Sequence, residues 1–166
     1  SEDNIEKCLN SIDNSIKVIV VENSNNKIFK KYLENKFSNV DCILTNDNLG
    51  YGKANNIALK KVVTSYSLIL NPDTTLREDA IDNFFTVINN DLDFSIIAPE
   101  QSKKDFHLRG NQSELIKTDK VEGFAMFLNM KKFFQIGFFD ENFFLYLEEI
   151  DLCKRVKKNK GKIYIS

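Results

Sequence analysis

The chain has 166 residues, of which 42% are hydrophobic and 28% charged, and its formal net charge is −1 at pH 7. This length fits one domain with a sizeable core. The near-neutral charge argues against nucleic acid or an anionic membrane surface as a partner. No apolar run reaches the roughly 18 residues of a membrane span. The three cysteines form no CxxC pair, which argues against a disulfide framework and a structural zinc site.

Helix and strand patterns alternate through the first 100 residues. Apolar residues at i, i+3, i+4 and i+7 mark the helices, and short β-branched runs mark buried strands. Helices are predicted at 3–12, 27–37, 54–63 and 77–90, and strands at 16–23, 40–46, 66–73 and 94–99. This alternation predicts an α/β domain with a mainly parallel sheet flanked by helices.

The second half of the chain is less regular. Residues 99–120 are polar and weakly periodic, which predicts a long functional or mobile loop. Residues 121–139 predict a strand and a short helix, and residues 140–166 a turn, a helix and a closing strand. Because the chain starts within a helix and stops on an apolar strand, we expect a segment of a longer protein.

Polar residues follow three of the predicted strands, at Glu22–Asn23, Asn46–Gly52 and Asn71–Asp73. Parallel strands joined by right-handed crossovers end at one edge of the sheet, where open α/β sheets bind ligands. Asp73, placed after a strand that Pro72 stops, is a candidate oxygen ligand for Mg²⁺ or Mn²⁺. The alternative interpretation is an ordinary Asn-Pro-Asp turn.

The other two strand ends also allow two interpretations each. The Asn23 amide offers a donor and an acceptor to a nucleobase edge, or else Asn23 or Ser24 caps the next helix. The stretch 46–53, "NDNLGYGK", has glycines two apart before a helix and could cradle phosphate. It lacks the third glycine of a dinucleotide fingerprint and does not match a P-loop. The alternative interpretation is therefore an ordinary Asn/Gly loop without a phosphate-binding role.

The stretch "FFLYLEEIDLCKR" places three carboxylates in the first turn of a predicted helix, where the helix dipole stabilises anions. Spacing puts Glu148, Asp151 and Arg155 on one face with an Asp151–Arg155 ion pair. Glu149 lies about 100° around the helix and is a candidate general base, unless this is only an acidic helix start. His107, the only histidine, has no partner pattern for catalysis or zinc. The Phe-rich run at 133–144 predicts core or the wall of an acceptor cleft.

Taken in order, these stretches resemble the family 2 glycosyltransferases, in particular their bacterial rhamnosyltransferase-like branch. The resemblance rests on "VIVVENSN", "NDNLGYGKANNIAL", "LILNPDTTL", "VEGFAMFLNMKKFFQIGFFDENFFLYLEEIDLCKRV" and "GKIYIS". It implies a GT-A (Rossmann-like) fold whose first strand is missing from this chain. It also implies a nucleotide-sugar donor and a divalent metal, Mg²⁺ or Mn²⁺.

The resemblance assigns roles to individual positions. Asp73 would bind the metal, in Asn-Pro-Asp rather than Asp-x-Asp form, and Glu149 would be the base, one methylene longer than the family's usual Asp. Gly123 matches the glycine before the acceptor-side strand. The positions implied on the donor side are Glu22, Asn23, Asn48, Gly50, Asn55, Asn71 and Asp73.

The implied function is an inverting, metal-dependent transfer from a UDP- or dTDP-sugar to a glycan or lipid-linked acceptor in bacterial cell-surface polysaccharide synthesis. We expect one catalytic domain over 1–166, with a donor half (1–100) and an acceptor half (101–166). The expected location is the cytoplasm, including the inner face of the membrane. The alternatives are a catalytically silent sugar-nucleotide or glycan-binding module and a sugar nucleotidyltransferase.

Overall fold

The computed structural model describes residues 2–89, 92–99 and 115–166. His107 and most of the predicted 99–120 loop lie outside these residues. The helices are α1 (Glu2–Asn10), α2 (Lys27–Lys36), α3 (Tyr51–Leu59), α4 (Ala80–Asn89), α5 (Met130–Ile136) and α6 (Glu148–Lys158). The strands are β1 (Val18–Glu22), β2 (Val40–Leu44), β3 (Tyr66–Leu70), β4 (Ile96–Ala98), β5 (Ile116–Thr118), β6 (Ala125–Asn129) and β7 (Ile163–Ile165).

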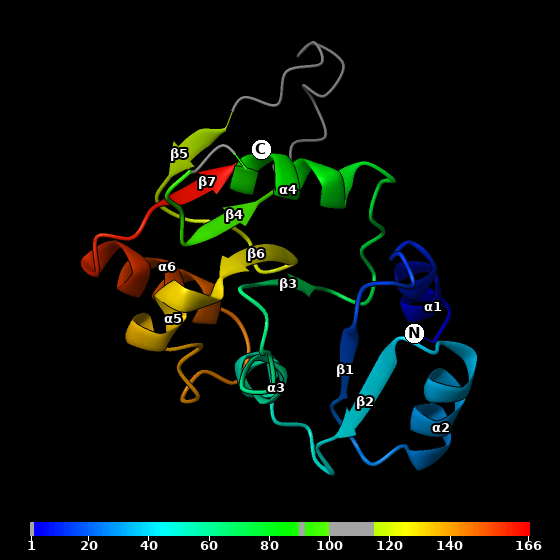
Figure 1. The fold of residues 1–166 in the computed structure, drawn as a ribbon. Helices are drawn as coiled ribbons and strands as arrows, with labels where there is room; N and C mark the ends of the chain where they lie inside the picture. Colours follow the sequence, from blue (N-terminus) through cyan, green and yellow to red (C-terminus); the bar gives the residue numbers. More distant parts are fainter. Residues whose placement is uncertain (1, 90–91, 100–114) are drawn as a thin grey trace.

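The strands form two sheets, a parallel pair β1–β2 and a five-stranded sheet in the order β3-β6-β4-β7-β5 (Figure 1). The predicted α/β class is confirmed. The larger sheet is mixed: β4 and β7 pair in parallel, whereas β6 is antiparallel to both β3 and β4. It follows that β3, β4 and β7 run in one direction, with β6 inserted against them.

Several elements differ from the sequence prediction, among them α4, which begins at Ala80 rather than at residue 77. Strand β5 falls in the stretch predicted as loop, and it pairs antiparallel with β7 at the edge of the sheet. A strand of three residues gives too short an alternation to detect in a sequence. Helix α3 begins at Tyr51 rather than at residue 54, directly after Gly50, whose φ is +79°.

Helices cover both faces of the larger sheet (Figure 1). One face packs Met126 and Leu128 of β6 against α3, α5 and α6. On the other face Phe127 stacks on Phe84 of α4, with ring centroids 4.4 Å apart. The alternation of neighbouring β6 residues between the two cores is the period-2 pattern of a strand covered on both sides. A third core lies between β1–β2 and helices α1 and α2 around the fully buried Leu33.

Strand β1 has one edge that pairs with no strand among the described residues, and so does β3. All five β1 residues are only half-buried, although "VIVV" is the composition of a buried strand. Hydrogen bonds from Val18 N to Asn39 O and from Thr45 N to Glu22 O join the even-numbered residues of β1 to β2. By alternation, the N–H groups of Ile19 and Val21 point to the free edge.

We predict that a strand preceding α1 in the full-length protein pairs with this free edge. Amide exchange followed by NMR then shows the Ile19 and Val21 N–H groups protected in the full-length protein. In the 1–166 chain the same groups exchange at least about tenfold faster. Val20, which faces β2, is the internal control and stays protected in both. Equal protection of Ile19 and Val21 in the two chains would contradict the prediction.

Candidate active site

The candidate site begins at the end of β3. Leu70 pairs with Ala125, and the next backbone hydrogen bond runs from Asn71 N to Phe124 O at 2.8 Å. The turn of residues 71–73 therefore lies beside the start of β6. Pro72 has no N–H to continue the ladder, so the chain leaves the sheet there.

Asp73 is exposed at this turn, and none of the hydrogen bonds or ion pairs found among the described residues involves its carboxylate. Helix α1 contacts the turn, because Cys8 Sγ donates to Asn71 O at 3.7 Å. Directly after α1, Ser11 Oγ accepts a hydrogen bond from Leu76 N at 3.0 Å. Burial, together with the nearby Asp73 carboxylate, raises the pKa of the Cys8 thiol to about 11. Among the described residues, Asp73 is thus an exposed carboxylate without a bonded partner at the end of β3.

Among the described residues, no group of three or more His, Cys, Asp or Glu side chains is placed to hold a metal ion. One exposed carboxylate fits a Mg²⁺ or Mn²⁺ ion that takes its other ligands from substrate phosphates and water. A closed structural metal site, by contrast, needs more protein ligands than this edge provides. Asp73 stays our predicted metal ligand on this ground.

Asn23, which follows β1, uses its whole amide inside the protein. Its Nδ2 donates to Asn48 Oδ1 at 3.0 Å and to Gly50 O at 3.3 Å. Its Oδ1 accepts from Leu49 N at 3.0 Å and Thr45 Oγ1 at 3.2 Å. Direct contact with a nucleobase edge would cost these bonds, so the structure shows Asn23 ordering the loop of residues 45–50.

The alternative role of Asn23 or Ser24 as a helix cap is wrong. Asn26 is the N-cap of α2, and its Oδ1 accepts a hydrogen bond from Phe29 N at 2.9 Å. Ser24 instead donates its hydroxyl to the Glu22 carboxylate. Glu22 is half-buried at the tip of β1 and keeps its place among the predicted donor-side residues.

Gly50 brings the loop against the segment that precedes α6. A β-carbon built on Gly50 would lie 2.0 Å from Phe144 O, and Tyr51 N donates to the same carbonyl at 3.1 Å. With φ at +79° and ψ at 178°, its backbone is in a region that only glycine adopts without strain. The glycine thus permits a close backbone approach between the two halves of the site.

Of the two asparagines in α3, the structure gives the buried position to Asn56. Asn55 Nδ2 bonds to Tyr51 O within the helix. Asn56, 3% exposed, donates to Phe139 O at 2.9 Å and accepts from Phe139 N at 3.0 Å. Sequence reasoning missed Asn56, because its partner is 83 residues away.

The acidic start of α6 divides into separate roles. The predicted Asp151–Arg155 pair is confirmed, with Arg155 Nε 2.7 Å from Asp151 Oδ2. Arg155 also donates to the carbonyls of Ile136 and Phe138, so it ties α6 to the end of α5. Glu148 is 4% exposed, and its Oε2 has no hydrogen-bond partner in the part of the chain that the structure describes. Burial raises the pKa of Glu148, with a smaller contribution from the charge of Glu149.

Glu149 is half-buried, and its side chain makes none of the hydrogen bonds or ion pairs found among the described residues. A β-carbon built on Gly123 would lie 3.7 Å from Glu149 Cβ. Gly123 precedes Phe124, which bonds to Asn71. The candidate base therefore lies beside the short segment that is bonded to the candidate metal turn.

The aromatic run before α6 has mixed surroundings. Phe133 and Phe139 are buried core residues, as predicted. In contrast, the four residues directly before Glu148 are all more than half exposed, and two of them have positive φ. These residues are Phe144, Leu145, Tyr146 and Leu147, with φ of 68° and 72° at the last two.

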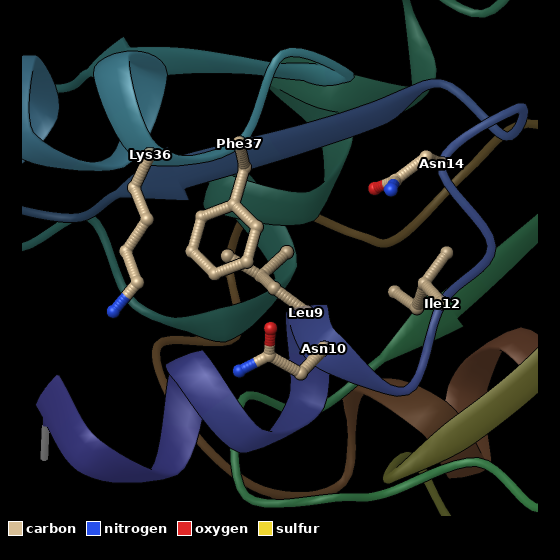
Figure 2. A pocket seen from close by; sticks show the side chains of 6 residues that line it. All are labelled: Leu9, Asn10, Ile12, Asn14, Lys36 and Phe37. Carbon is tan, nitrogen blue, oxygen red and sulfur yellow. The ribbon is translucent and has the colours of Figure 1, made fainter.

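A separate hollow of about 240 Å³ lies between the ends of α1 and α2 (Figure 2). None of the candidate site residues lines it. Leu9 and Phe37 face each other there, with Lys36 and Asn10 at the opening. We assign this hollow no part in the site.

The fold thus places one exposed carboxylate, Asp73, after β3 and a second, half-buried one, Glu149, near the segment that precedes β6. A family model for glycosyl transferase family 2 matches residues 1–153, and the chain belongs to this family. The low-salt glycan biosynthesis hexosyltransferase Agl10 of Haloferax volcanii is 25% identical over 188 residues, which cover 98% of this chain and 60% of Agl10. The rhamnosyltransferase WbbL of Escherichia coli K12 is 25% identical, over 93% of this chain and 72% of WbbL.

Comparison with solved structures shows the same fold. The mannosyltransferase PcManGT of Pyrobaculum calidifontis, solved with GDP-Man and Mn²⁺, superposes with a TM-score of 0.76 at 11% identity. The match covers the whole of this chain and 53% of that one, and it confirms the GT-A fold. The chain thus spans about half the length of PcManGT and three fifths of the length of Agl10. Among the described residues, every helix is too short or too polar to cross a membrane.

We predict that Gly50→Ala destabilises the fold by about 3 kcal/mol, because backbone strain and the overlap with Phe144 O act together. Gly137→Ala is the matched control. Gly137 has φ +78°, but a β-carbon there meets only Arg155 Nη1 at 3.8 Å. It should cost about 1–2 kcal/mol through strain alone. Urea unfolding measures both, and equal losses would contradict the close approach at Gly50.

We predict that Glu148 makes the fold less stable at alkaline pH. Its raised pKa means that the folded protein binds the proton more tightly than the unfolded chain, so stability falls as pH rises from the normal pKa through the raised one. Glu148→Gln cannot ionise, and the difference in melting temperature between variant and wild type should therefore shift in favour of the variant from pH 4 to pH 8. A difference independent of pH would contradict the burial of this carboxyl group.

Proposed function

We propose that the protein transfers a sugar from a nucleotide-sugar donor to a hydroxyl group of a glycan or lipid-linked acceptor, with inversion at the anomeric carbon. One observation carries the proposal. Glu149, which has no partner among the described residues, lies near Gly123, and the adjacent Phe124 bonds to the turn that holds the exposed Asp73. A proton acceptor and a metal-type carboxylate thereby flank one short segment.

In the proposed reaction the Glu149 carboxylate takes the proton of the acceptor hydroxyl. The acceptor oxygen forms a bond to the anomeric carbon as the bond from that carbon to the phosphate oxygen breaks. The nucleoside diphosphate leaves with the electron pair. A base within hydrogen-bond reach of the hydroxyl is the geometric requirement.

A divalent metal, Mg²⁺ or Mn²⁺, would supply neutralisation of the charge on the diphosphate, and Asp73 is the residue that would hold it. No described residue bonds to the Asp73 carboxylate, which supports this assignment. PcManGT, with the same fold, was solved with Mn²⁺ and GDP-Man. We propose a UDP- or dTDP-sugar as the donor of this protein.

The remaining donor-side residues act in two ways in this proposal. Glu22 at the tip of β1 contacts the nucleobase of the donor directly. Asn23 acts through its four hydrogen bonds, which fix the loop that carries Asn48 and Gly50. Asn55 and Asn71 complete the donor side, at the first turns of α3 and after β3.

A second candidate is a catalytically silent sugar-nucleotide-binding module. The observation that favours it is Glu149, which carries one methylene more than the Asp usual in this family. The backbone would have to shift to offset this extra methylene and keep the carboxylate within reach of the acceptor hydroxyl. Binding of UDP with Mn²⁺ without release of nucleoside diphosphate from any donor would support this candidate. We propose a role in polysaccharide synthesis in the cytoplasm only for the first candidate, the active sugar transferase.

We predict that Glu149→Gln and Asp73→Asn in the full-length protein each lower sugar transfer by about 10²-fold or more, because one removes the base and the other the metal ligand. The assay measures nucleoside diphosphate release from UDP-, dTDP- and GDP-sugars with Mn²⁺ and an extract of cell-surface glycan as acceptor. Controls are Asp82→Asn and Glu78→Gln, two exposed carboxylates outside the site. Undiminished transfer in either site variant would refute its assignment.

Glu149→Asp tests the extra methylene directly. If the backbone compensates for Glu, shortening the side chain withdraws the carboxylate from the acceptor, and transfer falls by about tenfold. A gain in transfer would show instead that the position is tuned for Asp. The loss of transfer in Glu149→Gln remains the reference for both results.

A further inference from the structure

The Tyr51 side chain connects the donor loop with the acceptor side of the candidate site. Tyr51 is the first residue of α3, and its hydroxyl donates to the Gly123 carbonyl across 72 residues of sequence. Its ring packs edge-on against the buried Phe139, with centroids 5.6 Å apart. Burial, with the carboxylates of Glu148 and Glu149 nearby, raises the pKa of Tyr51. The hydroxyl thus stays protonated and remains a donor.

The two peptide carbonyls at Gly123 and Phe124 accept from opposite parts of the site. Gly123 O accepts from the Tyr51 hydroxyl, and Phe124 O accepts from Asn71 N at 2.8 Å. This dipeptide precedes β6, and among the described residues the pairing of β6 with β3 begins at Ala125. The two bonds therefore help to hold the dipeptide in place.

Gly123 also lies near the candidate base. A β-carbon built there would lie 3.4 Å from the Tyr51 hydroxyl oxygen and 3.7 Å from Glu149 Cβ. The Tyr51 hydroxyl, the Gly123 backbone and the Glu149 side chain consequently form one layer of contacts. A shift of the Gly123 carbonyl would change the space in which Glu149 lies.

We propose that Tyr51 is a positioning residue whose hydroxyl, through Gly123, sets Glu149 relative to the turn of residues 71–73. The proposal rests on the proposed function, in which Glu149 is the base and Asp73 the metal ligand. Tyr51 touches neither the base's carboxylate nor the donor in this role, and it acts through the backbone of the dipeptide. The same ring without the hydroxyl should pack normally but leave the dipeptide loose.

The test compares Tyr51→Phe with Tyr66→Phe in the full-length protein. Tyr66 stacks in the core beside α4, and its hydroxyl makes none of the hydrogen bonds found among the described residues. We expect Tyr51→Phe to lower the transfer rate kcat about tenfold with the KM for the donor within twofold. In a Glu149→Gln background the same change should alter the residual rate less than twofold, since the residue through which Tyr51 acts is already lost.

A second measurement does not require turnover. The Asn71 amide, bonded to Phe124 O, should exchange about five- to tenfold faster in Tyr51→Phe than in the wild type, and at the wild-type rate in Tyr66→Phe. Unchanged Asn71 exchange in Tyr51→Phe overturns the proposal. An equal loss of transfer in the wild-type and Glu149→Gln backgrounds also overturns it, because Tyr51 would then act on the donor or on the fold.

The two measurements separate this proposal from the proposed function. Absence of transfer by the wild type from every donor, with accelerated Asn71 exchange in Tyr51→Phe, would refute the enzymatic function and keep the structural link. Transfer that Tyr51→Phe leaves within twofold of the wild type would refute the positioning role and keep the enzyme.

Discussion

The antiparallel insertion of β6 between β3 and β4 is the constraint on which the candidate site depends. It turns the start of β6 toward the end of β3, so that the ladder finishes with the bond from Asn71 N to Phe124 O. A purely parallel sheet would place the start of a strand at the opposite edge from the polar strand ends. With β6 reversed, an element of the second half of the chain enters the edge where Asp73 lies.

A glycine allows the loop after β2 to approach this edge. Gly50 lets that loop contact the backbone at Phe144, and the next residue, Tyr51, donates its hydroxyl to Gly123 O. The acidic first turn of α6 is then divided by environment. Glu148 is buried with its pKa raised, Asp151 is neutralised by Arg155, and the Glu149 carboxylate has no partner among the described residues. Charge crowding at the helix start thus leaves one group available for chemistry.

Much of this arrangement follows from local sequence patterns. Apolar periodicity locates the helices and six of the seven strands, and the i, i+4 spacing predicts the Asp151–Arg155 pair. The missed features depend on distant partners. The direction of β6, the clamp of Asn56 on Phe139 and the bond from Tyr51 to Gly123 join residues about 60 to 85 apart in sequence. Asn23 is a further example. The sequence does not show whether its amide bonds to a ligand or to the neighbouring loop, and only the hydrogen-bond partners in the structure decide this.

The central claim is that Asp73 and Glu149 belong to one site, with the metal at the first and the base at the second. Paramagnetic broadening by Mn²⁺ tests this directly in the full-length protein with UDP bound and glutamate side chains ¹³C-labelled. The account predicts that Mn²⁺ broadens the Glu149 carboxylate signal and that Asp73→Asn abolishes the effect. Broadening that spares Glu149, or that persists unchanged in Asp73→Asn, would contradict it.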